Sequence, residues 1–182
     1  MRRRTIDVLA SSAGVVAAIV LLVAGIYFNQ RYDFAENNVR DQLRAQQIFF
    51  PDQADLTDEE LEQSGVVKYA GQQVDTGRKA EVYANEFIAL HLSEIADGKT
   101  YSQLSSESRA NPDDEELAGQ VQASFRGETL RGLLLTTYGF WQLGQEARLM
   151  TIVCFAGAAI LLVLSIIGFV HAFRTRRDEI VT

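Results

Sequence analysis

Cysteine and histidine are scarce in this chain of 182 residues, which has one cysteine and two histidines. The single cysteine, Cys154, excludes an internal disulfide, and inside an apolar run it is typical of a small packing side chain. Structural and catalytic metal sites need three or four converging ligands. The sequence therefore predicts no bound metal, no cofactor and no Ser/His/Asp catalysis, whereas catalysis by carboxylates alone stays open.

Strand signals are missing as well. No segment shows a sustained alternation of polar and apolar residues, and no Asn-Gly or Asp-Gly hairpin turn joins two such segments. Only two prolines, Pro51 and Pro112, interrupt the chain, and we find no internal repeat or low-complexity tract. The sequence predicts an all-α fold.

Charged residues are absent from two long apolar runs, residues 8–28 and residues 149–173, apart from His171 in the second. Each run exceeds the roughly 20 residues that a helix needs to cross the hydrocarbon core of a bilayer. Both runs are apolar on all sides, unlike the helices of a soluble core. We expect two transmembrane helices. The alternative for residues 8–28 is a signal peptide, although 21 apolar residues are long for one.

Basic residues orient the two predicted spans. Under the positive-inside rule, short arginine-rich flanks remain in the cytoplasm. Residues 1–7 and 174–182 are then cytoplasmic, and residues 29–148, with 11 basic against 21 acidic side chains and a net charge of −10, form an extracytoplasmic domain at the bacterial plasma membrane. The arginines of the two flanks are Arg2, Arg3, Arg4, Arg174, Arg176 and Arg177.

Aromatic residues cluster at the outer ends of both predicted spans. Tyr27 and Phe28 end the first span, and Tyr138 and Trp141 precede the second. Amphipathic rings favour the headgroup layer, so these four side chains, with Arg174, Arg176 and Arg177 on the opposite face, are predicted to lie at the membrane interface. The alternative for Trp141 and its neighbour Phe140 is packing in the core of the outer domain.

Small residues recur at four-residue spacing in both spans and predict close helix packing. The sequence leaves open whether the two spans pack on each other or on a foreign helix. The residues concerned are Ala10, Gly14, Ala18, Gly168 and Ala172.

Several helices are expected between the spans. A stripe at Ala35, Val39 and Leu43 extends the first span as a helix. Thr57 with Glu60 and Thr100 with Gln103 match capping boxes, and a helix break is expected near Gly65. The best amphipathic helix is capped by Asp75 or Thr76 and ends at Gly98. A further helix follows Pro112 and breaks at Gly127. Its expected inner face is Leu117, Val121 and Phe125, and that of the amphipathic helix is Ala80, Tyr83, Ala84, Phe87, Leu90, His91 and Ile95.

Three motifs in the outer segment invite a chemical reading. His91 and Glu94 share a spacing used by metal-binding bundles, but one pair is not a site. Lys99 and Thr100 after Gly98 resemble the end of a phosphate-binding loop, yet the upstream glycine is missing, so a helix stop and cap is the better interpretation. The acidic runs at residues 58–60 and 113–116 are predicted to be solvated first turns that steer a basic partner.

Four segments of the outer part of the chain are distinctive, namely QQIFFPD, YAGQQVDTGRKAEVYANEFIALHL, GKTYSQLSSES and TLRGLLLTTYGFWQLGQ. They resemble a largely uncharacterised family of small two-span membrane proteins of actinobacteria. The resemblance implies topology and lineage and carries no catalytic residues. Small helical accessory subunits of similar size occur in the actinobacterial respiratory supercomplex, which joins cytochrome bcc to a terminal oxidase.

We therefore expect a non-enzymatic accessory subunit of a larger plasma-membrane assembly, with the respiratory supercomplex as the specific hypothesis. Its expected partners are membrane lipids, other integral membrane subunits and a basic extracytoplasmic protein, and the acidic outer segment disfavours nucleic acid. The alternative is an extracytoplasmic sensor or adaptor that recruits a separate signalling partner, because the predicted tail of nine residues holds no output domain.

Overall fold

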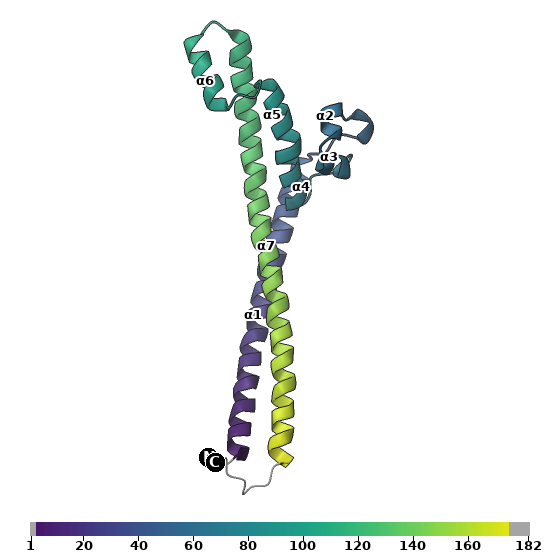
Figure 1. Cartoon of the computed structure of the whole chain (residues 1–182), viewed down its shortest axis with the longest axis vertical. Helices are drawn as coiled ribbons and strands as arrows, with labels where there is room; N and C mark the ends of the chain where they lie inside the picture. The colour runs from purple at the N-terminus through teal and green to yellow at the C-terminus, as the bar shows by residue number, and fades with distance from the viewer. Residues whose placement is uncertain (1–2, 175–182) are drawn as a thin grey trace. The chain divides into compact units, whose positions relative to one another are not determined.

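The computed structural model describes residues 3–174. About 85% of these residues are helical, and none of them forms a strand. The first and last helices along the chain, α1 (Arg3–Gln46) and α7 (Glu115–Arg174), are long, and the elements between them are short (Figure 1). The shorter elements are η1 (Gln53–Asp55), α2 (Asp58–Leu61), α3 (Ser64–Tyr69), α4 (Gly77–Val82), the π-helical turn η2 (Tyr83–Ile88), α5 (Ala89–Ile95) and α6 (Tyr101–Ala110).

The chain divides into two compact units, and α1 and α7 contribute to both. Unit 1 contains residues 3–34 and 144–174 of the described chain, and unit 2 contains residues 35–143. The boundary at residue 143 lies inside α7, so no break in the backbone marks it.

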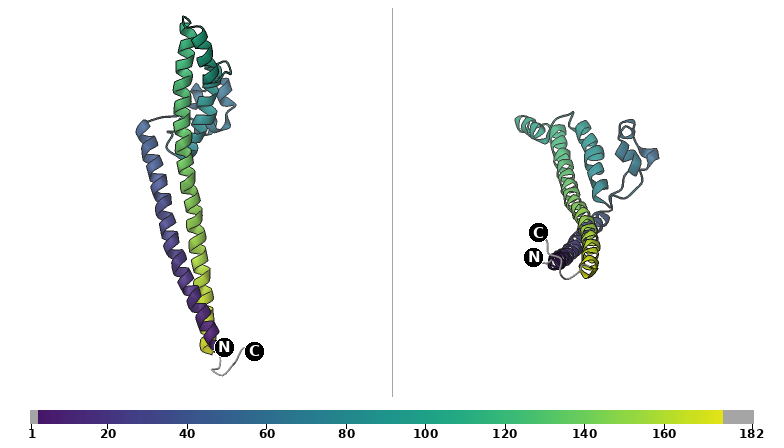
Figure 2. Two further views of the ribbon diagram at one scale, coloured as in Figure 1. Left: turned by 90° about the vertical axis from the view of Figure 1, so that its left-hand side faces the viewer. Right: turned by 60° about the horizontal axis from the view of Figure 1, so that its bottom comes forward.

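Unit 1 is a pair of antiparallel helices (Figures 1 and 2). The Arg4 guanidinium lies 5.9 Å from the centroid of the Phe173 ring, so the start of α1 meets the end of α7. Farther along the pair, Gly25 faces the Phe155 ring and Gly157 faces Leu21. Both helices are long and apolar enough to cross a membrane, and 17% of the most apolar stretch of each is buried in the structure.

Unit 2 has its own hydrophobic core. Val39 and Leu43 of α1 are 3% and 1% exposed and pack with Leu134 of α7, as the stripe in the sequence predicts. The rest of the core comes from the segment between the long helices, including Phe50, Val66, Val74, Ala80, Val82, Ala84, Ile88 and Leu92. Gly127 of α7 faces the Leu92 side chain, and the Tyr101 and Phe125 rings lie 5.7 Å apart, so α5 and α6 both contact α7.

The predicted helix caps are confirmed. In both capping boxes, the threonine hydroxyl accepts from the backbone N–H three residues on, and the Glu60 or Gln103 side chain accepts from the threonine N–H. The Thr76 hydroxyl caps α4 by accepting from the Lys79 N–H. Gly98 has a φ of +71°, and its N–H donates to the Ser93 carbonyl oxygen, which ends the helix in the left-handed conformation that favours glycine.

The predicted inner face of the amphipathic helix is correct only in its first half. Ala80 and Ala84 are buried as expected, and Tyr83 and Phe87 are partly buried against the core. The buried residues that follow are Ile88, Leu92 and Ala96, in place of His91 and Ile95. The π-helical turn η2 explains the difference, because its wider turn inserts one extra residue and rotates the rest of the helix by that residue. A calculation with regular helical spacing cannot foresee this shift.

Two other local predictions are wrong, those for Gly127 and Phe125. Gly127 does not break the helix, and α7 runs from Glu115 without interruption, because the missing side chain makes room for Leu92. The break expected near Gly65 is confirmed, since α2 ends at Leu61 and α3 begins at Ser64, and Gly65 itself lies in α3. Phe125 is 50% exposed, and the buried residue of that stretch of α7 is Ser124.

Candidate interaction sites

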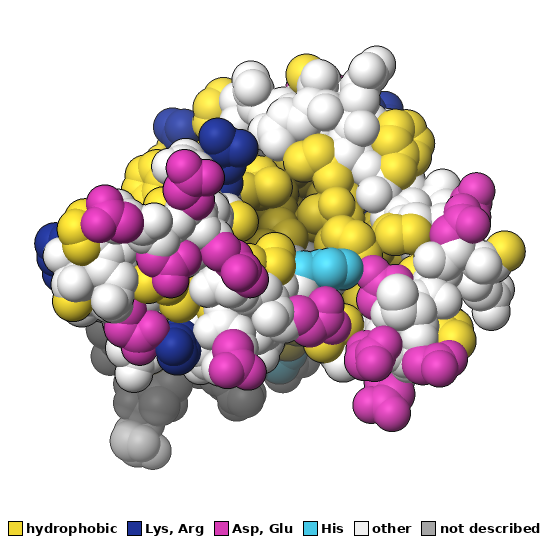
Figure 3. Space-filling view, turned by 90° about the horizontal axis from the view of Figure 1, so that it is seen from above, with side chains coloured by type: hydrophobic (Ala, Val, Ile, Leu, Met, Phe, Trp, Pro, Cys, Tyr) yellow, Lys and Arg dark blue, Asp and Glu magenta, His cyan; other side chains and the backbone are white. Residues whose placement is uncertain are grey.

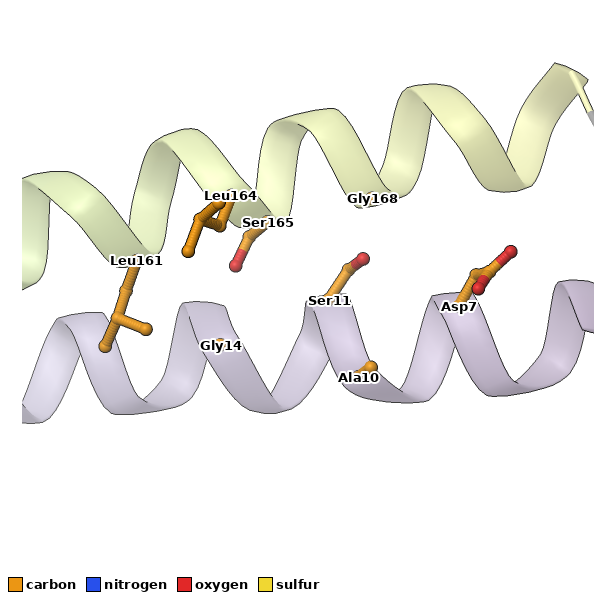
Figure 4. Close-up of a pocket in the computed structure, with 8 residues that line it drawn as sticks. All are labelled: Asp7, Ala10, Ser11, Gly14, Leu161, Leu164, Ser165 and Gly168. Atoms are coloured by element: carbon orange, nitrogen blue, oxygen red, sulfur yellow. The ribbon is translucent and has the colours of Figure 1, made fainter.

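The seam between the two helices of unit 1 is built from reciprocal serine–glycine contacts. Ser165 of α7 lies against Gly14 of α1, and Ser11 of α1 lies against Gly168 of α7 (Figure 4). In both helices the serine comes three residues before the glycine, so the antiparallel arrangement matches each serine with the glycine of the other helix. A Cβ on either glycine would collide with the serine hydroxyl, which is why small residues are needed here.

The remaining small residues of the seam fall into two groups. Ala18 and Ala172 are 0% and 1% exposed, whereas Ala10 is exposed and lines a groove of about 270 Å³ between the helices. The seam shows close contacts of Gly14 and Gly168 within this chain, while contact of these residues with a foreign helix stays a prediction. The sequence did not lead us to predict a role for Ser11 and Ser165. The three-residue spacing from each serine to a glycine is the pattern that indicates such a role.

Asp7 lies in the same groove, near the start of α1. Its Oδ2 atom is buried and has no hydrogen-bond partner in the described part of the chain, and it lies 3.9 Å from His171 Nε2. The contact places His171, which the sequence assigned to the last turn of the second span, beside a carboxylate of the first helix.

The faces of unit 1 that point away from the seam are apolar and exposed. On α1, Val16, Val20 and Val23 are each more than 60% exposed. On α7, exposures near 60% recur over several turns, at Leu149, Ile160, Ile166 and Ile167. A soluble protein rarely leaves such a contiguous apolar surface uncovered, and lipid or another apolar helix is the natural solvent for it.

The predicted interface residues at the first helix are accessible. Tyr27 is 51% exposed, its ring lies 4.9 Å below the Arg31 guanidinium, and its centroid is 5.6 Å from that of Phe28. Arg174 is exposed at the end of α7. Arg2, Arg176 and Arg177 lie outside the described residues.

Trp141 packs within unit 2, as the alternative interpretation of this residue requires. Its indole N–H donates to Glu36 Oε2 at 2.9 Å, and its ring packs on Gly77 at the start of α4. Tyr138 stacks on it at 6.0 Å, and the Arg78 guanidinium lies over both rings. A role of Trp141 and Tyr138 at the membrane interface stays a prediction, and Phe140 is 39% exposed.

His91 pairs with Glu60. Its Nε2 lies 3.3 Å from Glu60 Oε1, and its Nδ1 lies 2.8 Å from the Phe87 carbonyl oxygen. A carbonyl oxygen only accepts, so Nδ1 carries a proton, and the contact with Glu60 becomes an ion pair when Nε2 is protonated as well. Glu60 is 4% exposed, so the prediction that residues 58–60 form a solvated first turn is wrong for this residue.

Asp75 joins α1 to α4. Its two oxygens accept from Lys79 Nζ at 2.9 Å and from Arg44 at 3.3 Å. Desolvation by burial acts to raise the pKa of this carboxyl, but the hydrogen bonds and charges of Lys79 and Arg44 outweigh it and lower the pKa below its usual value.

The other acidic run, residues 113–116, is exposed, and the Asp114 carboxylate accepts from the Leu117 N–H at the start of α7. Figure 3 shows acidic side chains on both sides of a hollow lined by apolar side chains.

Thr100 acts as the cap of α6, which agrees with the helix stop and cap expected for residues 98–100. Among residues 3–174, no group of three or more His, Cys, Asp or Glu side chains is placed to hold a metal ion.

These features define an all-helical protein with two helices suited to a membrane and a second helical unit with its own core. Comparisons with protein-family models, with curated proteins and with solved structures give no match.

Proposed function

We propose that the chain is a non-enzymatic accessory subunit of a larger plasma-membrane assembly. The observation that supports this most strongly is the exposed apolar surface of unit 1, on the faces of α1 and α7 that point away from their seam. The seam already occupies Gly14 and Gly168, so these outward faces remain for lipids and for the helices of other integral membrane subunits.

The proposed topology follows from the antiparallel pair. Arg4 meets Phe173, so the two described ends of unit 1 lie together, and a pair that crosses a bilayer has both ends on one side. The arginines next to these ends favour the cytoplasmic side. Residues 29–148 then form a helical extracytoplasmic domain, whose exposed carboxylates offer a basic protein a complementary surface.

The respiratory supercomplex that joins cytochrome bcc to a terminal oxidase is the specific assembly we propose. Its identity is tested by extracting a tagged chain from native membranes in a mild detergent, followed by native gels and mass spectrometry. We expect integral membrane proteins in stoichiometric amounts, including subunits of that supercomplex. A chain that migrates alone contradicts the accessory role, whereas a different stoichiometric partner contradicts only the supercomplex.

A matched pair of variants locates the contact. Ile160→Trp places a bulky ring on an outward face of α7, and Leu133→Trp places the same ring at an equally exposed position in unit 2. Co-purification is expected to fall for Ile160→Trp and to persist for Leu133→Trp if α7 makes the contact within the membrane.

A further inference from the structure

Unit 2 contains a small cavity that the proposed function does not use. It has a volume of about 180 Å³ and lies between α5, the loop that leads to α6, and α7. Leu92 and Ala89 provide apolar walls, while Lys99, Ser124, Glu128 and Arg131 bring polar groups to it. Its size suits a molecule of a few heavy atoms, because sites for drug-sized ligands usually begin at roughly 300 Å³.

Two hydrogen-bond donors lie at this cavity. Ser124 is 2% exposed, and it lines the cavity together with Arg131. The Nε atom of Arg131 is also buried and has no partner within residues 3–174. A buried donor without an acceptor costs free energy, so the Arg131 Nε–H, with the Ser124 hydroxyl beside the same cavity, points to a ligand that brings acceptor oxygens.

The remaining groups of the cavity restrict the charge of that ligand. Arg131 uses its other nitrogens on Asn85, at 3.2 Å, and on Glu128, at 3.5 Å, which holds the guanidinium in place. Lys99 donates to Glu107 at 2.7 Å, and this hydrogen bond raises the pKa of the ammonium group, so Lys99 stays charged. The two carboxylates offset the charge of the two cations, so a dianion such as phosphate is disfavoured relative to a ligand with a single negative charge.

We propose that this cavity binds a small monocarboxylate, with the carboxylate oxygens accepting from Arg131 Nε and the Ser124 hydroxyl. Arginine and a hydroxyl match the planar geometry of a carboxylate, and the short apolar part of the ligand lies against Leu92 and Ala89. The proposal concerns unit 2 alone, so it does not depend on the membrane assembly proposed above.

The test follows the arginine Nε–H resonances of the full chain in detergent micelles by NMR, with sodium propionate as the probe and sodium chloride as the ionic-strength control. The Arg131 resonance is the one that disappears in Arg131→Gln. We expect propionate to shift this resonance in a saturable way and chloride to leave it in place. The absence of a saturable shift overturns the proposal.

Variants separate binding at this cavity from binding elsewhere. Ser124→Ala is expected to weaken propionate binding about tenfold, in line with the loss of one hydrogen bond to a charged group. Arg131→Gln should abolish binding, while the exposed control Arg126→Gln should bind as the unaltered chain does. Circular dichroism checks that each variant is folded. If Arg131→Gln is unfolded, the propionate affinity of Ser124→Ala tests the proposal. Unchanged affinity in Ser124→Ala, or tighter binding of inorganic phosphate than of propionate, overturns the proposal.

Discussion

At the scale of single residues, Trp141 shows how a side chain expected at a membrane interface can also hold a folded unit together. Its ring packs on Gly77, and its N–H donates to Glu36, which lies 105 positions earlier in the sequence. A hydrogen bond to a carboxylate is worth more than one between neutral groups. Trp141 therefore ties the α1 part of unit 2 to its α7 part.

Replacing Trp141 by Phe should lower the free energy of unfolding by about 1–2 kcal/mol, because the ring is largely kept and the hydrogen bond to Glu36 is lost. Thermal and urea unfolding followed by circular dichroism measures the change. Tyr138→Phe is the control, since it keeps the stacked ring. Equal stabilities of the two variants would contradict the role of the indole N–H.

The pH dependence of stability should reveal Asp75. Its pKa is lowered in the folded chain, so its contribution to stability is present above the usual pKa of an aspartate, about 3.9, and is lost as the pH falls through the lowered folded value. Urea unfolding between about pH 5 and pH 2 should therefore show a smaller loss of stability on acidification in Asp75→Asn than in the unaltered chain. A parallel pH dependence of the two proteins would count against this contribution.

Sequence reasoning worked at this scale wherever the interaction is local. The capping boxes of Thr57 and Thr100 involve residues three positions apart, so their geometry can be read from the sequence. The contacts of Glu36 with Trp141 and of His91 with Glu60 join distant segments, and no local pattern specifies them. For His91, the helical spacing pointed to Glu94 as the neighbouring carboxylate, whereas the structure places Glu60 beside its ring.

At the scale of elements, the π-helical turn η2 decides which residues of the following helix are buried. Leu92 is 8% exposed and Ile95 is 41% exposed, the reverse of what regular helical spacing predicts. We expect Leu92→Ala to cost about 2–5 kcal/mol in unfolding free energy and Ile95→Ala less than about 1 kcal/mol. Urea unfolding of both variants measures the difference, and a larger loss for Ile95→Ala would show that the helix is regular.

The serine–glycine seam gives a second prediction at this scale. Gly14→Leu should separate the helices of unit 1, because the new side chain meets Ser165, whereas Ala13→Leu adds the same bulk at an exposed position. The separation is measured as disulfide formation between cysteines placed at Leu21 and Gly157, which face each other, with Cys154→Ala as background. Crosslinking should drop for Gly14→Leu only, and equal crosslinking in both variants would contradict the seam.

The sequence predicted the extent of the long helices better than the contacts that these helices make with other elements. Absence of charge over more than 20 residues is a strong signal for a membrane helix, and the stripe at Val39 and Leu43 correctly extended α1 beyond the first apolar run. Glycine was a weaker signal, because Gly98 ends a helix while Gly127 lies in the middle of one. The difference lies in tertiary packing, since Gly127 makes room for Leu92.

At the scale of the whole molecule, the two units differ in how much of their apolar surface they bury themselves. Unit 2 buries its own apolar side chains around Val39, Leu43 and Leu134. Unit 1 leaves most of its apolar surface uncovered, and this surface needs hydrocarbon or another apolar partner. We therefore propose, as the claim on which the other proposals about unit 1 depend, that α1 and α7 cross a membrane and that the acidic helical unit lies on its outer side.

Labelling of single cysteines with a membrane-impermeant maleimide tests this claim most directly. In a Cys154→Ala background, Ser102→Cys places a thiol on the exposed surface of α6, and Thr182→Cys places one in the C-terminal tail. We predict that intact cells are labelled at position 102, and at position 182 only after the membrane is permeabilised. Protection of position 102 in intact cells, or recovery of the chain in the soluble fraction, would contradict the account.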